Sequence, residues 1–327
     1  MARLLAGASA ETPFGEIVSG IIPVIIPVCG REDVFATTAL LRAQPYADGL
    51  RFAIIDNGNV SGLSARLKAL EGADCHVISF PENRGGSAAY IAGVDYAMRE
   101  FPEAPYVWLL DDDAKPDART LSGLVETMDR LVREDAKAAS LGSAVVSAAD
   151  PDRIVECGAA FSPFLGHSFP KLRGKSLSAI GERTVRVDYA AACSLLVRTD
   201  AVRALGFWED VFIHFDDIEW GVRVTRAGWH NYATTVSTVT HPEFDPKKAG
   251  AWICYFDARN QYWFASKFGP LHVAVARLKN KAKDFRAKLT GELIEGNAYR
   301  ALAWRDYKAG VRRTRTEVIE VVKGVGS

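Results

Sequence analysis

The feature that most constrains this chain is a short hydrophobic segment that ends directly in three aspartates. Residues Tyr106 to Leu110 are hydrophobic, and Asp111, Asp112 and Asp113 follow without a break. A run of this length and composition predicts a strand buried on both faces, of the kind found in the middle of a parallel sheet. Side chains alternate along an extended strand, so Asp111 and Asp113 are expected on one side and Asp112 on the other.

Two carboxylates that point the same way at the carboxyl end of a central strand form a site for a hard divalent cation. Ligands of open α/β sheets also bind at these strand ends. A solvated acidic turn is the alternative. However, three adjacent like charges repel each other, and Lys115 is the only obvious cationic partner in this segment. The segment therefore favours a metal site at Asp111 and Asp113.

The length and composition limit the classes of protein to which this chain can belong. With 327 residues, 48% hydrophobic and 24% charged, the chain can bury one large α/β core plus an appendage, or two ordinary domains. Lys plus Arg and Asp plus Glu both number 40, so the net charge gives no reason to expect a nucleic-acid partner. The five cysteines are scattered among apolar residues without metal spacing, which is typical of reduced thiols in a cytosolic protein.

The hydrophobic stretches bear on membrane association. Residues 1–20 imitate a signal peptide only faintly, because their apolar core is too short, and we interpret them as a loose N-terminal lead. No uninterrupted apolar stretch approaches the roughly 20 residues that a membrane span needs. The protein is therefore expected to be cytoplasmic, either soluble or peripheral on the inner face of the cell membrane.

The first half of the chain alternates between strand and helix patterns. Besides the acidic strand, the pattern predicts strands over 21–29, 52–55 and 76–80, and helices near 34–44, from Ser87 onward and over 121–132. This alternation predicts a doubly wound, mostly parallel sheet. The second half is less regular, with a long strand over 185–197, a short helix capped by Asp200, a helix that ends at Gly228, and a strand over 232–239. From about residue 250 the pattern is aromatic, then basic and helical.

Polar clusters follow the second and third predicted strands. They are Asp56-Asn57-Gly58 and Asn83-Arg84-Gly85-Gly86. A carboxylate and an amide at these positions can hydrogen-bond a base or ribose, and glycines let the backbone approach a diphosphate. Each cluster alone is compatible with an ordinary turn, but three consecutive strands with such ends favour a nucleotide site. Neither a Walker-type loop nor a Gly-x-Gly-x-x-Gly motif follows a strand, which disfavours P-loop ATPases and dinucleotide dehydrogenases.

A third acidic cluster contains the candidate general base. Asp216 and Glu219 have the spacing of a helix capping box, which leaves Asp217 without a structural role. Asp217 is therefore the first candidate to take a proton from an attacking hydroxyl. Asp216 is the second candidate, because a one-residue error in the cap position exchanges the two.

His241 follows the predicted strand over 232–239 and precedes Pro242. An isolated histidine in a loop is usually exposed to solvent. Imidazole also binds transition metals well, so His241 could complete the coordination begun by Asp111 and Asp113 and bias the choice toward manganese.

In this order, these motifs resemble those of the family 2 glycosyltransferases, which have the GT-A fold. The resemblance runs from about residue 21 to 241. It implies a GT-A catalytic domain over 21–249 and a helical extension over 250–327. It also implies a nucleotide sugar, in which Asp56 contacts the base. The full implied set of nucleotide-sugar ligands is Asp56, Asn57, Asn83, Arg84, Gly85, Gly86 and Asp112. The Asp-x-Asp pair would hold Mn²⁺ or Mg²⁺ on the diphosphate, and an aspartate of the acidic motif after Phe212 would be the base.

Within the family, the sequence looks most like that of galactofuranosyltransferases. The similar segments are those around Asp111 and Asp216 and the Thr-His-Pro segment at His241. That resemblance implies an inverting transfer from UDP-galactofuranose to a hydroxyl of a lipid-linked or cell-surface glycan. Rhamnosyltransferases that use dTDP-rhamnose are similar. The usual Thr-Tyr-Asn after the first strand is replaced here by the segment 27–31, and the length fits a priming or short-chain transferase.

Two other classes remain open at this stage. A sugar nucleotidyltransferase shares the sheet architecture but usually has a Gly-rich, Arg-containing loop after the first strand, and Cys29-Gly30-Arg31 is a poor match to it. A catalytically inactive nucleotide-sugar binding module is the other alternative. Retention of all the acidic positions argues against it.

Two groups of residues are candidates for contacts with the acceptor side of the reaction. Trp208, Trp220 and Trp108 are possible stacking surfaces for a sugar, with core positions as the alternative, and Glu219 is a further acceptor candidate. The basic segment 277–288 is either a solvated helix face or a docking surface for anionic lipid, which would suit a polyprenyl-linked glycan acceptor.

Overall fold

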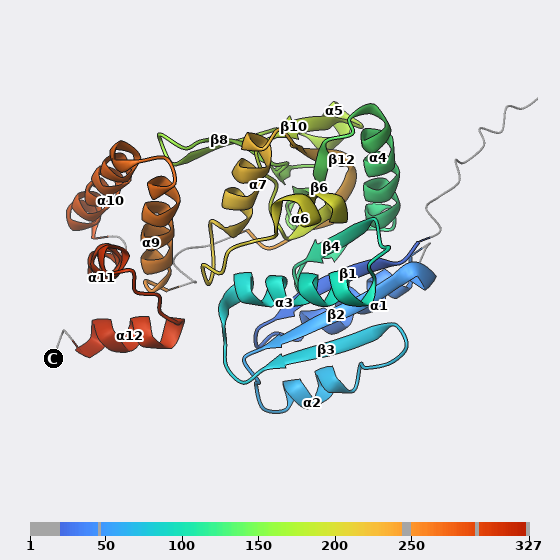
Figure 1. Cartoon of the computed structure of the whole chain (residues 1–327), viewed down its shortest axis with the longest axis horizontal. Helices are drawn as coiled ribbons and strands as arrows, with labels where there is room; N and C mark the ends of the chain where they lie inside the picture. The colour runs from blue at the N-terminus through green and yellow to red at the C-terminus, as the bar shows by residue number, and fades with distance from the viewer. Residues whose placement is uncertain (1–19, 45–46, 244–249, 292–293, 325–327) are drawn as a thin grey trace, which may run out of the picture.

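A computed structural model describes residues 20–44, 47–243, 250–291 and 294–324; the expected lead over 1–20 lies almost entirely outside the described residues. The chain folds around one large sheet (Figure 1). Its main path has the strand order β10-β12-β6-β11-β4-β1-β2-β3. Six of these strands run in one direction, and β10 and β11 run in the other. The expected α/β fold with a mainly parallel sheet is therefore confirmed.

The first half forms the regular parallel part of the sheet. Its strands are β1 (Ile22–Val28), β2 (Leu50–Asn57), β3 (Cys75–Phe80) and β4 (Tyr106–Leu110), all mutually parallel. The connecting elements are α1 (Asp33–Arg42), the short η1 (Ala47–Gly49), α2 (Leu63–Lys68) and α3 (Gly85–Glu100). The hydrophobic runs predicted as buried strands are all strands here.

The second half adds a second parallel pair, β6 with β12, and several antiparallel strands beside it. The elements are β5 (Lys115–Pro116), α4 (Thr120–Glu134), β6 (Ala138–Val146), β7 (Ile154–Glu156), β10 (Thr184–Val187), β11 (Ser194–Arg198) and β12 (His230–Thr240). The single long strand predicted over 185–197 is wrong. Because β12 and β6 separate β10 from β11 in the sheet, the chain must leave the sheet over residues 188–193.

Helices cover both faces of the sheet, as a doubly wound fold requires. Helices α3, α6 (Thr199–Leu205) and α7 (Asp216–Arg226) pack on one face, and α1, α2 and α4 on the other. The alternation along β4 connects both cores, with Leu109 on the α3 side and Trp108 on the α4 side. Full burial of a side chain of this kind stabilises the fold by about 1.5–3 kcal/mol, so β4 is held firmly up to the point where the aspartates begin.

Three predicted helix starts differ from those observed. Helix α3 begins at Gly85, so Ser87 lies within its first turn. Helix α6 begins at Thr199 with Arg198 at the cap, so Asp200 is not the cap. Helix α7 has Phe215 at its cap, and Asp216 is its first residue. In each case the side chain expected at the cap has another partner, described below for Ser87 and Asp216.

The remaining helices form a compact group at one end of the molecule (Figure 1). They are α9 (Ile253–Ser266), α10 (Pro270–Thr290), α11 (Gly296–Ala309) and α12 (Arg315–Gly324). Tyr255, Phe256 and Tyr262 of α9 form the centre of their shared core. A hairpin of β8 (Ala159–Ser162) and β9 (His167–Pro170) reaches from the sheet toward this group (Figure 1). The short α5 (Leu177–Ile180), which follows in the chain, lies near β10 and α4 instead. None of the helices in the described part of the chain is long and apolar enough to cross a membrane.

Candidate active site

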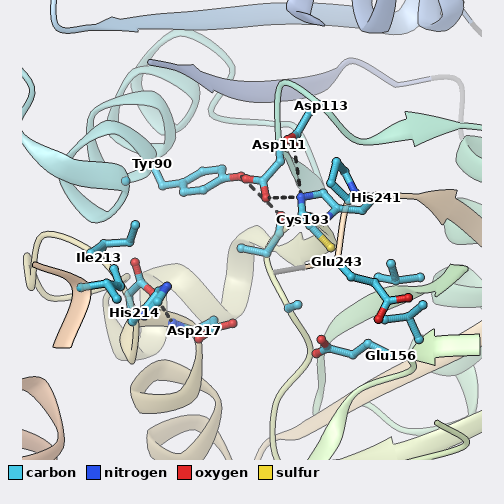
Figure 2. A pocket seen from close by; sticks show the side chains of 18 of the residues that line it. Tyr90, Asp111, Asp113, Glu156, Cys193, Ile213, His214, Asp217, His241 and Glu243 are labelled. Carbon is cyan, nitrogen blue, oxygen red and sulfur yellow. Dashed lines mark hydrogen bonds and ion pairs between the residues drawn. The ribbon is translucent and has the colours of Figure 1, made fainter. Parts of the chain in front are cut away.

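A cavity of about 510 Å³ opens at the carboxyl ends of the parallel strands. Such a volume is typical of a small-molecule site. Its wall includes Asp111 and Asp113 after β4, His241 after β12, and Asp216 and Asp217 at the start of α7. Figure 2 shows Asp217 and Glu156 across from the group formed by Asp111, Asp113 and His241. The tertiary structure therefore brings the two predicted acidic clusters and His241 to one cavity.

Asp111, Asp113 and His241 form a compact set of three possible metal ligands. The Nε2 atom of His241 lies 3.3 Å from Asp111 Oδ2 and 3.1 Å from Asp113 Oδ1. One ligand atom from each residue falls within 4.8 Å of the others. His241 reaches the aspartates because β12 pairs with β5, with Thr240 opposite Lys115, so both segments leave the sheet side by side.

The set fits a divalent metal ion. Two carboxylates and one imidazole are suitable ligands for manganese, and the carboxylates also suit magnesium. Asp113 Oδ1 is buried and lies 3.1 Å from His241 Nε2, so the two atoms face each other as ligands of one ion would. Burial lowers the pKa of His241, but hydrogen bonds and charge from Asp111 and Asp113 outweigh it and raise the pKa to about 10. The site therefore strongly attracts positive charge.

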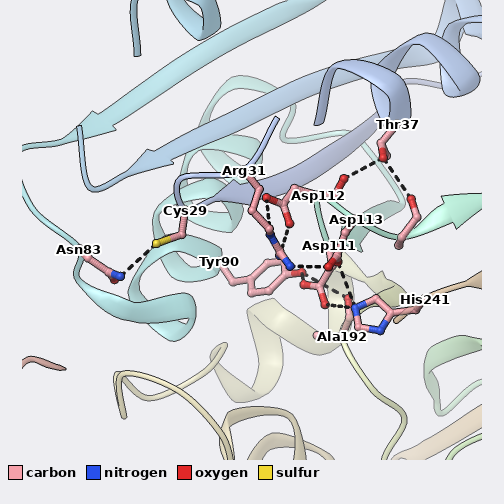
Figure 3. Close-up of polar contacts among 11 residues, drawn as sticks. Cys29, Arg31, Thr37, Asn83, Tyr90, Asp111, Asp112, Asp113, Ala192 and His241 are labelled. Carbon is pink, nitrogen blue, oxygen red and sulfur yellow. Dashed lines mark hydrogen bonds and ion pairs between the residues drawn. The ribbon is translucent and has the colours of Figure 1, made fainter. Parts of the chain in front are cut away.

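Two hydroxyl groups hold the aspartate segment in place (Figure 3). The buried Tyr90 of α3 donates a hydrogen bond of 2.7 Å to Asp111 Oδ1. Thr37 of α1 donates to the backbone oxygens of Asp112, at 2.8 Å, and Ala114, at 3.2 Å. Outer partners of this kind orient metal ligands. Sequence reasoning missed both, because Tyr90 and Thr37 have the spacing of ordinary core positions in their helices.

Arg31 lies across the aspartates and forms ion pairs with both Asp112 and Asp113. The strict alternation expected for the three aspartates does not apply, because β4 ends at Leu110 and a turn follows, in which Ala114 N donates to Asp111 O. Burial raises the pKa of Asp112 to about 7, although the guanidinium of Arg31 opposes the shift. Arg31 is half exposed and lines the cavity. From the sequence, the segment 27–31 stood out as a departure from the family pattern and as a poor match to the loop of nucleotidyltransferases, and neither observation indicated these ion pairs.

The two candidate bases have different surroundings. Asp216 Oδ2 accepts a 2.7 Å hydrogen bond from the Ser87 hydroxyl, and its Oδ1 accepts one of 3.1 Å from Asp217 N. Asp217 Oδ1 accepts from Ile218 N at 2.7 Å, and no hydrogen bond to its Oδ2 occurs within the described structure. The capping box predicted from Asp216 and Glu219 is absent, because both oxygens of Asp216 have these other donors.

The cavity raises the pKa of the carboxyl group of Asp217 well above its ordinary value. Burial is the largest cause, followed by the negative charges of Asp216 and Glu156. Glu156, on β7, also has a pKa raised by burial. A carboxyl group with a raised pKa is suited to accept a proton near neutral pH. Sequence reasoning missed Glu156, which lies in an ordinary β pattern far from the motifs.

The loop before α7 has a strained backbone. Phe212, His214 and Phe215 have φ values of 71°, 65° and 70°, in the left-handed region that bulky residues rarely adopt. Helix α9 holds this loop, because Asn260 Nδ2 lies within hydrogen-bonding distance of the backbone oxygens of Val211, Ile213 and His214. His214 also pairs with Asp257 at 2.6 Å; burial lowers its pKa, but this partner outweighs burial and raises it. Helix α9, which the sequence marks as an aromatic segment, thus positions the loop that leads to Asp216 and Asp217.

The predicted nucleotide-binding residues lie at the neighbouring strand ends. Asp56 is buried, and its Oδ2 has no hydrogen-bond partner. Asn57 is fully engaged within the protein: it donates to Gly85 O at 3.0 Å and accepts from Arg84 N at 2.8 Å. Asn83 accepts from Gly85 N at 2.8 Å and donates to Cys29 Sγ at 3.1 Å. The two asparagines therefore shape this loop.

Gly85 and Gly86 have different surroundings. A Cβ atom on Gly85 would lie 2.1 Å from Phe212 O, whereas one on Gly86, which lines the cavity, would meet nothing within 4 Å. Arg84 lies over the Phe80 ring, 4.9 Å from its centroid.

Of the residues proposed to contact the acceptor, only Trp208 lines the cavity. The buried Nε1 of Trp208 has no hydrogen-bond partner. Trp220 and Trp108 instead belong to the core, with exposed fractions of 1% and 0%. Glu219 is buried outside the cavity, where it pairs with Arg223 at 3.1 Å and with Lys267 at 2.8 Å.

Comparisons with known proteins agree with this geometry. Residues 24–149 match the family model described as Glycosyl transferase family 2. A crystal structure of GalNAc-T7 with UDP, GalNAc and Mn2+ is similar, with a TM-score of 0.55 at 10% sequence identity. The similarity covers 77% of this chain and 51% of that chain, so this chain spans about half the length of the matched structure. No curated protein sequence matches this chain.

The structural similarity shows a fold of the GT-A type, and residues 24–149 match the glycosyl transferase family 2 model. Together they support a glycosyltransferase enzyme.

Proposed function

We propose that this protein is an inverting, metal-dependent glycosyltransferase that moves a sugar from a nucleotide diphosphate to an acceptor hydroxyl. One observation carries the proposal: the Asp111–Asp113–His241 group and Asp217 line the same cavity at the carboxyl ends of the strands. A cation-attracting group and a carboxylate of raised pKa on one cavity suit a reaction that needs both diphosphate neutralisation and proton removal.

In this proposal, Asp111, Asp113 and His241 hold Mn²⁺ or Mg²⁺. A bound divalent ion would neutralise the diphosphate and stabilise the departing nucleotide. Tyr90 orients Asp111 through its 2.7 Å hydrogen bond. Arg31 supplies a further positive charge beside Asp112 and Asp113, at the edge of the cavity where phosphate oxygens would lie.

Asp217 is the proposed base. It takes the proton from the acceptor hydroxyl while the hydroxyl oxygen forms a bond to the anomeric carbon. The bond from that carbon to the nucleotide oxygen breaks on the opposite side, which inverts the configuration. Asp216 is less suitable, because Ser87 and Asp217 N already engage both of its carboxylate oxygens. It serves instead to hold the start of α7.

The nucleotide is proposed to lie over Asp56 and the loop 83–86. The unpartnered Oδ2 of Asp56 can accept a hydrogen bond from a base N–H. Helix α3 begins at Gly85, where Gly85 N donates to Asn83 and Ser87 N to Phe212 O. Gly86 N has no acceptor in the described part of the chain and, at this positive end of the helix, favours phosphate. Trp208 lines the cavity and has a buried Nε1 without a hydrogen-bond partner, and it is the one aromatic candidate that we retain for a sugar contact.

We propose UDP-galactofuranose as the donor, because the sequence motifs around Asp111, Asp216 and His241 resemble those of galactofuranosyltransferases. A rhamnosyltransferase using dTDP-rhamnose is the alternative. The acceptor is proposed to be a hydroxyl of a lipid-linked or cell-surface glycan, reached from the cytoplasmic side of the membrane. A sugar nucleotidyltransferase is not favoured, since the family match and the fold support glycosyl transfer.

The test is a panel of sugar nucleotides incubated with the protein and Mn²⁺. We expect metal-dependent release of UDP from UDP-galactofuranose, increased by a glycan acceptor and abolished by EDTA. Release of TDP from dTDP-rhamnose would select the alternative donor. Formation of pyrophosphate, or turnover that EDTA leaves undiminished, would contradict the proposal.

A further inference from the structure

Large hydrophobic side chains are exposed along one side of α10. Leu271, Leu278, Phe285 and Leu289 are 63%, 71%, 65% and 71% exposed. Their spacings of seven, seven and four residues place them in one line along the helix. We call these four residues the α10 stripe. Single exposed hydrophobic residues are ordinary, but a continuous stripe of this kind indicates an interaction surface.

The tip of the β8–β9 hairpin extends this surface. Phe164 and Leu165 at the tip are 46% and 45% exposed. The tip is tied to α10, because Lys279 Nζ donates to the backbone oxygens of Leu165, at 2.5 Å, and Gly166, at 2.9 Å. The Phe164 ring also contacts His272, with 5.5 Å between ring centroids. Figure 1 shows the hairpin reaching toward α10.

The residues of α10 that carry a charge without an ion-pair partner in the described part of the chain are all basic. Four exposed basic residues of α10 form no ion pair within the described part of the chain: Lys281, Lys283, Arg286 and Lys288. Asp284, the only acidic residue in α10, is engaged with Arg300 at 2.5 Å. Between Glu156 and Glu182 the sequence contains no acidic residue, so the hairpin and the loop after it carry only basic charge.

We propose that the α10 stripe and the hairpin tip dock onto a lipid bilayer that contains anionic headgroups. The hydrophobic side chains would enter the boundary between headgroups and acyl chains, while the lysines and Arg286 remain at the level of the phosphates. A second copy of this chain is the less suitable occupant, because two stripes packed together would bring Lys281, Arg286 and Lys288 of both copies into contact.

Two elements connect the docking face to the cavity. β7, which contributes Glu156 to the cavity wall, leads directly into the hairpin, and α9 begins at the cavity with Trp252 and Ile253 before packing against α10. A docked protein would therefore hold the cavity close to the bilayer surface. This step rests on the proposed function, and it identifies the acceptor class as a glycan on a membrane-embedded lipid.

Co-sedimentation with vesicles tests the docking surface. The full chain is expected to bind vesicles of phosphatidylcholine with phosphatidylglycerol, to bind phosphatidylcholine alone much more weakly, and to lose binding as salt increases. The double variant Leu278→Ser/Phe285→Ser should bind at least about tenfold more weakly. The control Leu40→Ser/Val60→Ser removes two exposed hydrophobic residues elsewhere and should bind like the unaltered chain.

A second pair of variants tests the charges. Lys281→Gln/Lys288→Gln should weaken binding to the anionic vesicles, whereas Arg130→Gln/Arg133→Gln on α4 should not. Thermal unfolding confirms that each variant is folded. Failure of the unaltered chain to bind anionic vesicles, or undiminished binding by both α10 variants, would overturn the proposal. So would a dimer in solution that the Leu278/Phe285 variant dissociates while its vesicle binding stays intact.

Release of UDP without vesicles separates this proposal from the proposed function. The α10 variants should keep metal-dependent UDP release in solution, because none of their residues lines the cavity. Vesicle binding by a chain that releases no UDP would leave the docking surface standing and remove the function. UDP release by a chain that does not bind vesicles would support the proposed function and remove the docking surface.

Discussion

Asn260 on α9 lies 2.9 Å, measured from its Nδ2 atom, from the backbone oxygen of His214 in the loop that precedes Asp216. The same nitrogen lies 3.1 Å and 2.7 Å from the oxygens of Val211 and Ile213. One buried amide therefore stabilises a loop with three residues in the left-handed region. The C-terminal helices are thus linked directly to the proposed base, Asp217.

The first prediction concerns Asn260 as a positioning residue. Asn260→Ala leaves the backbone oxygens of Ile213 and His214 without this donor, whereas Val211 O keeps the Arg259 guanidinium at 2.8 Å. Each unsatisfied buried group costs about 1–3 kcal/mol. We expect lower stability and a kcat reduced by at least about tenfold at temperatures where the variant is folded. Mn²⁺ affinity should be unchanged, because the metal ligands lie on other elements. Gln261→Ala is the control: it removes a buried amide from the same helix that bonds to Gly166 and Asn280 instead. An equal loss of kcat in the control would show that general destabilisation is the cause.

The second prediction concerns Asp217 as the base. Asp217→Asn keeps an oxygen for Ile218 N but cannot accept the acceptor proton. The rate of transfer should fall by about 10²–10⁴-fold, the usual contribution of a general base, while UDP binding stays nearly unchanged. Because the pKa of Asp217 is raised, the rate of the unaltered enzyme should already decline at pH values where an ordinary aspartate is still ionised. A rate independent of pH down to the ordinary range of aspartate would contradict the assignment.

The third prediction concerns stability as a function of pH. A raised pKa in the folded state means that the folded protein binds the Asp217 proton more tightly than the unfolded chain does. Stability is therefore lost as pH rises from the unfolded value of about 3.9 through the folded value. Asp217→Asn removes this loss and should unfold at a higher temperature than the unaltered chain at neutral pH, with the difference shrinking toward pH 4. Thermal unfolding monitored at several pH values measures it, and a variant that is less stable at neutral pH would contradict it.

The fourth prediction concerns Tyr90 as the partner of a metal ligand. Tyr90→Phe removes the donor to Asp111 Oδ1 with almost no change in volume. Loss of such a partner typically weakens metal binding about 10–100-fold, which a Mn²⁺ titration followed by calorimetry would measure. Tyr106→Phe is the matched control, because its buried hydroxyl donates to Asp129 at 2.6 Å on the opposite face of the sheet. Equal weakening in both variants would refute a specific role for Tyr90.

The fifth prediction concerns Gly85, where the start of α3 meets the loop before α7. With φ of +86° and Phe212 O at 2.1 Å from the position of a Cβ, alanine is excluded on both counts. Gly85→Ala should destabilise the protein by about 1–2 kcal/mol for the backbone conformation and about 1–3 kcal/mol more for the contact. Gly86→Ala meets nothing within 4 Å and should be close to neutral for stability. Chemical denaturation of both variants makes the comparison.

Local patterns were sufficient for the strands of the first half and for the acidic clusters. The runs at β1, β2 and β4 are buried on both faces, so their composition alone predicts strands. β3 lies at the edge of the sheet and has buried and exposed positions, and its β-branched and aromatic residues still predict a strand. Since the carboxyl ends of parallel strands meet at one edge, the clusters after them were expected at a common site. Local sequence patterns were insufficient where the same pattern is compatible with two different structures. The run over 185–197 divides because its two halves occupy different positions in the sheet, and the capping box fails because Ser87 bonds to Asp216.

The sequence by itself determined the order of the strands along the chain, the acidic groups at their ends and the candidate metal ligands, because each of these depends on residues close together in the chain. The tertiary structure alone decided which side chains hold those groups. Tyr90 on Asp111, Asn260 on the loop of His214 and Arg31 on Asp112 are contacts across 21, 46 and 81 residues. No local pattern encodes such pairs, because they form only when the sheet and its covering helices pack together.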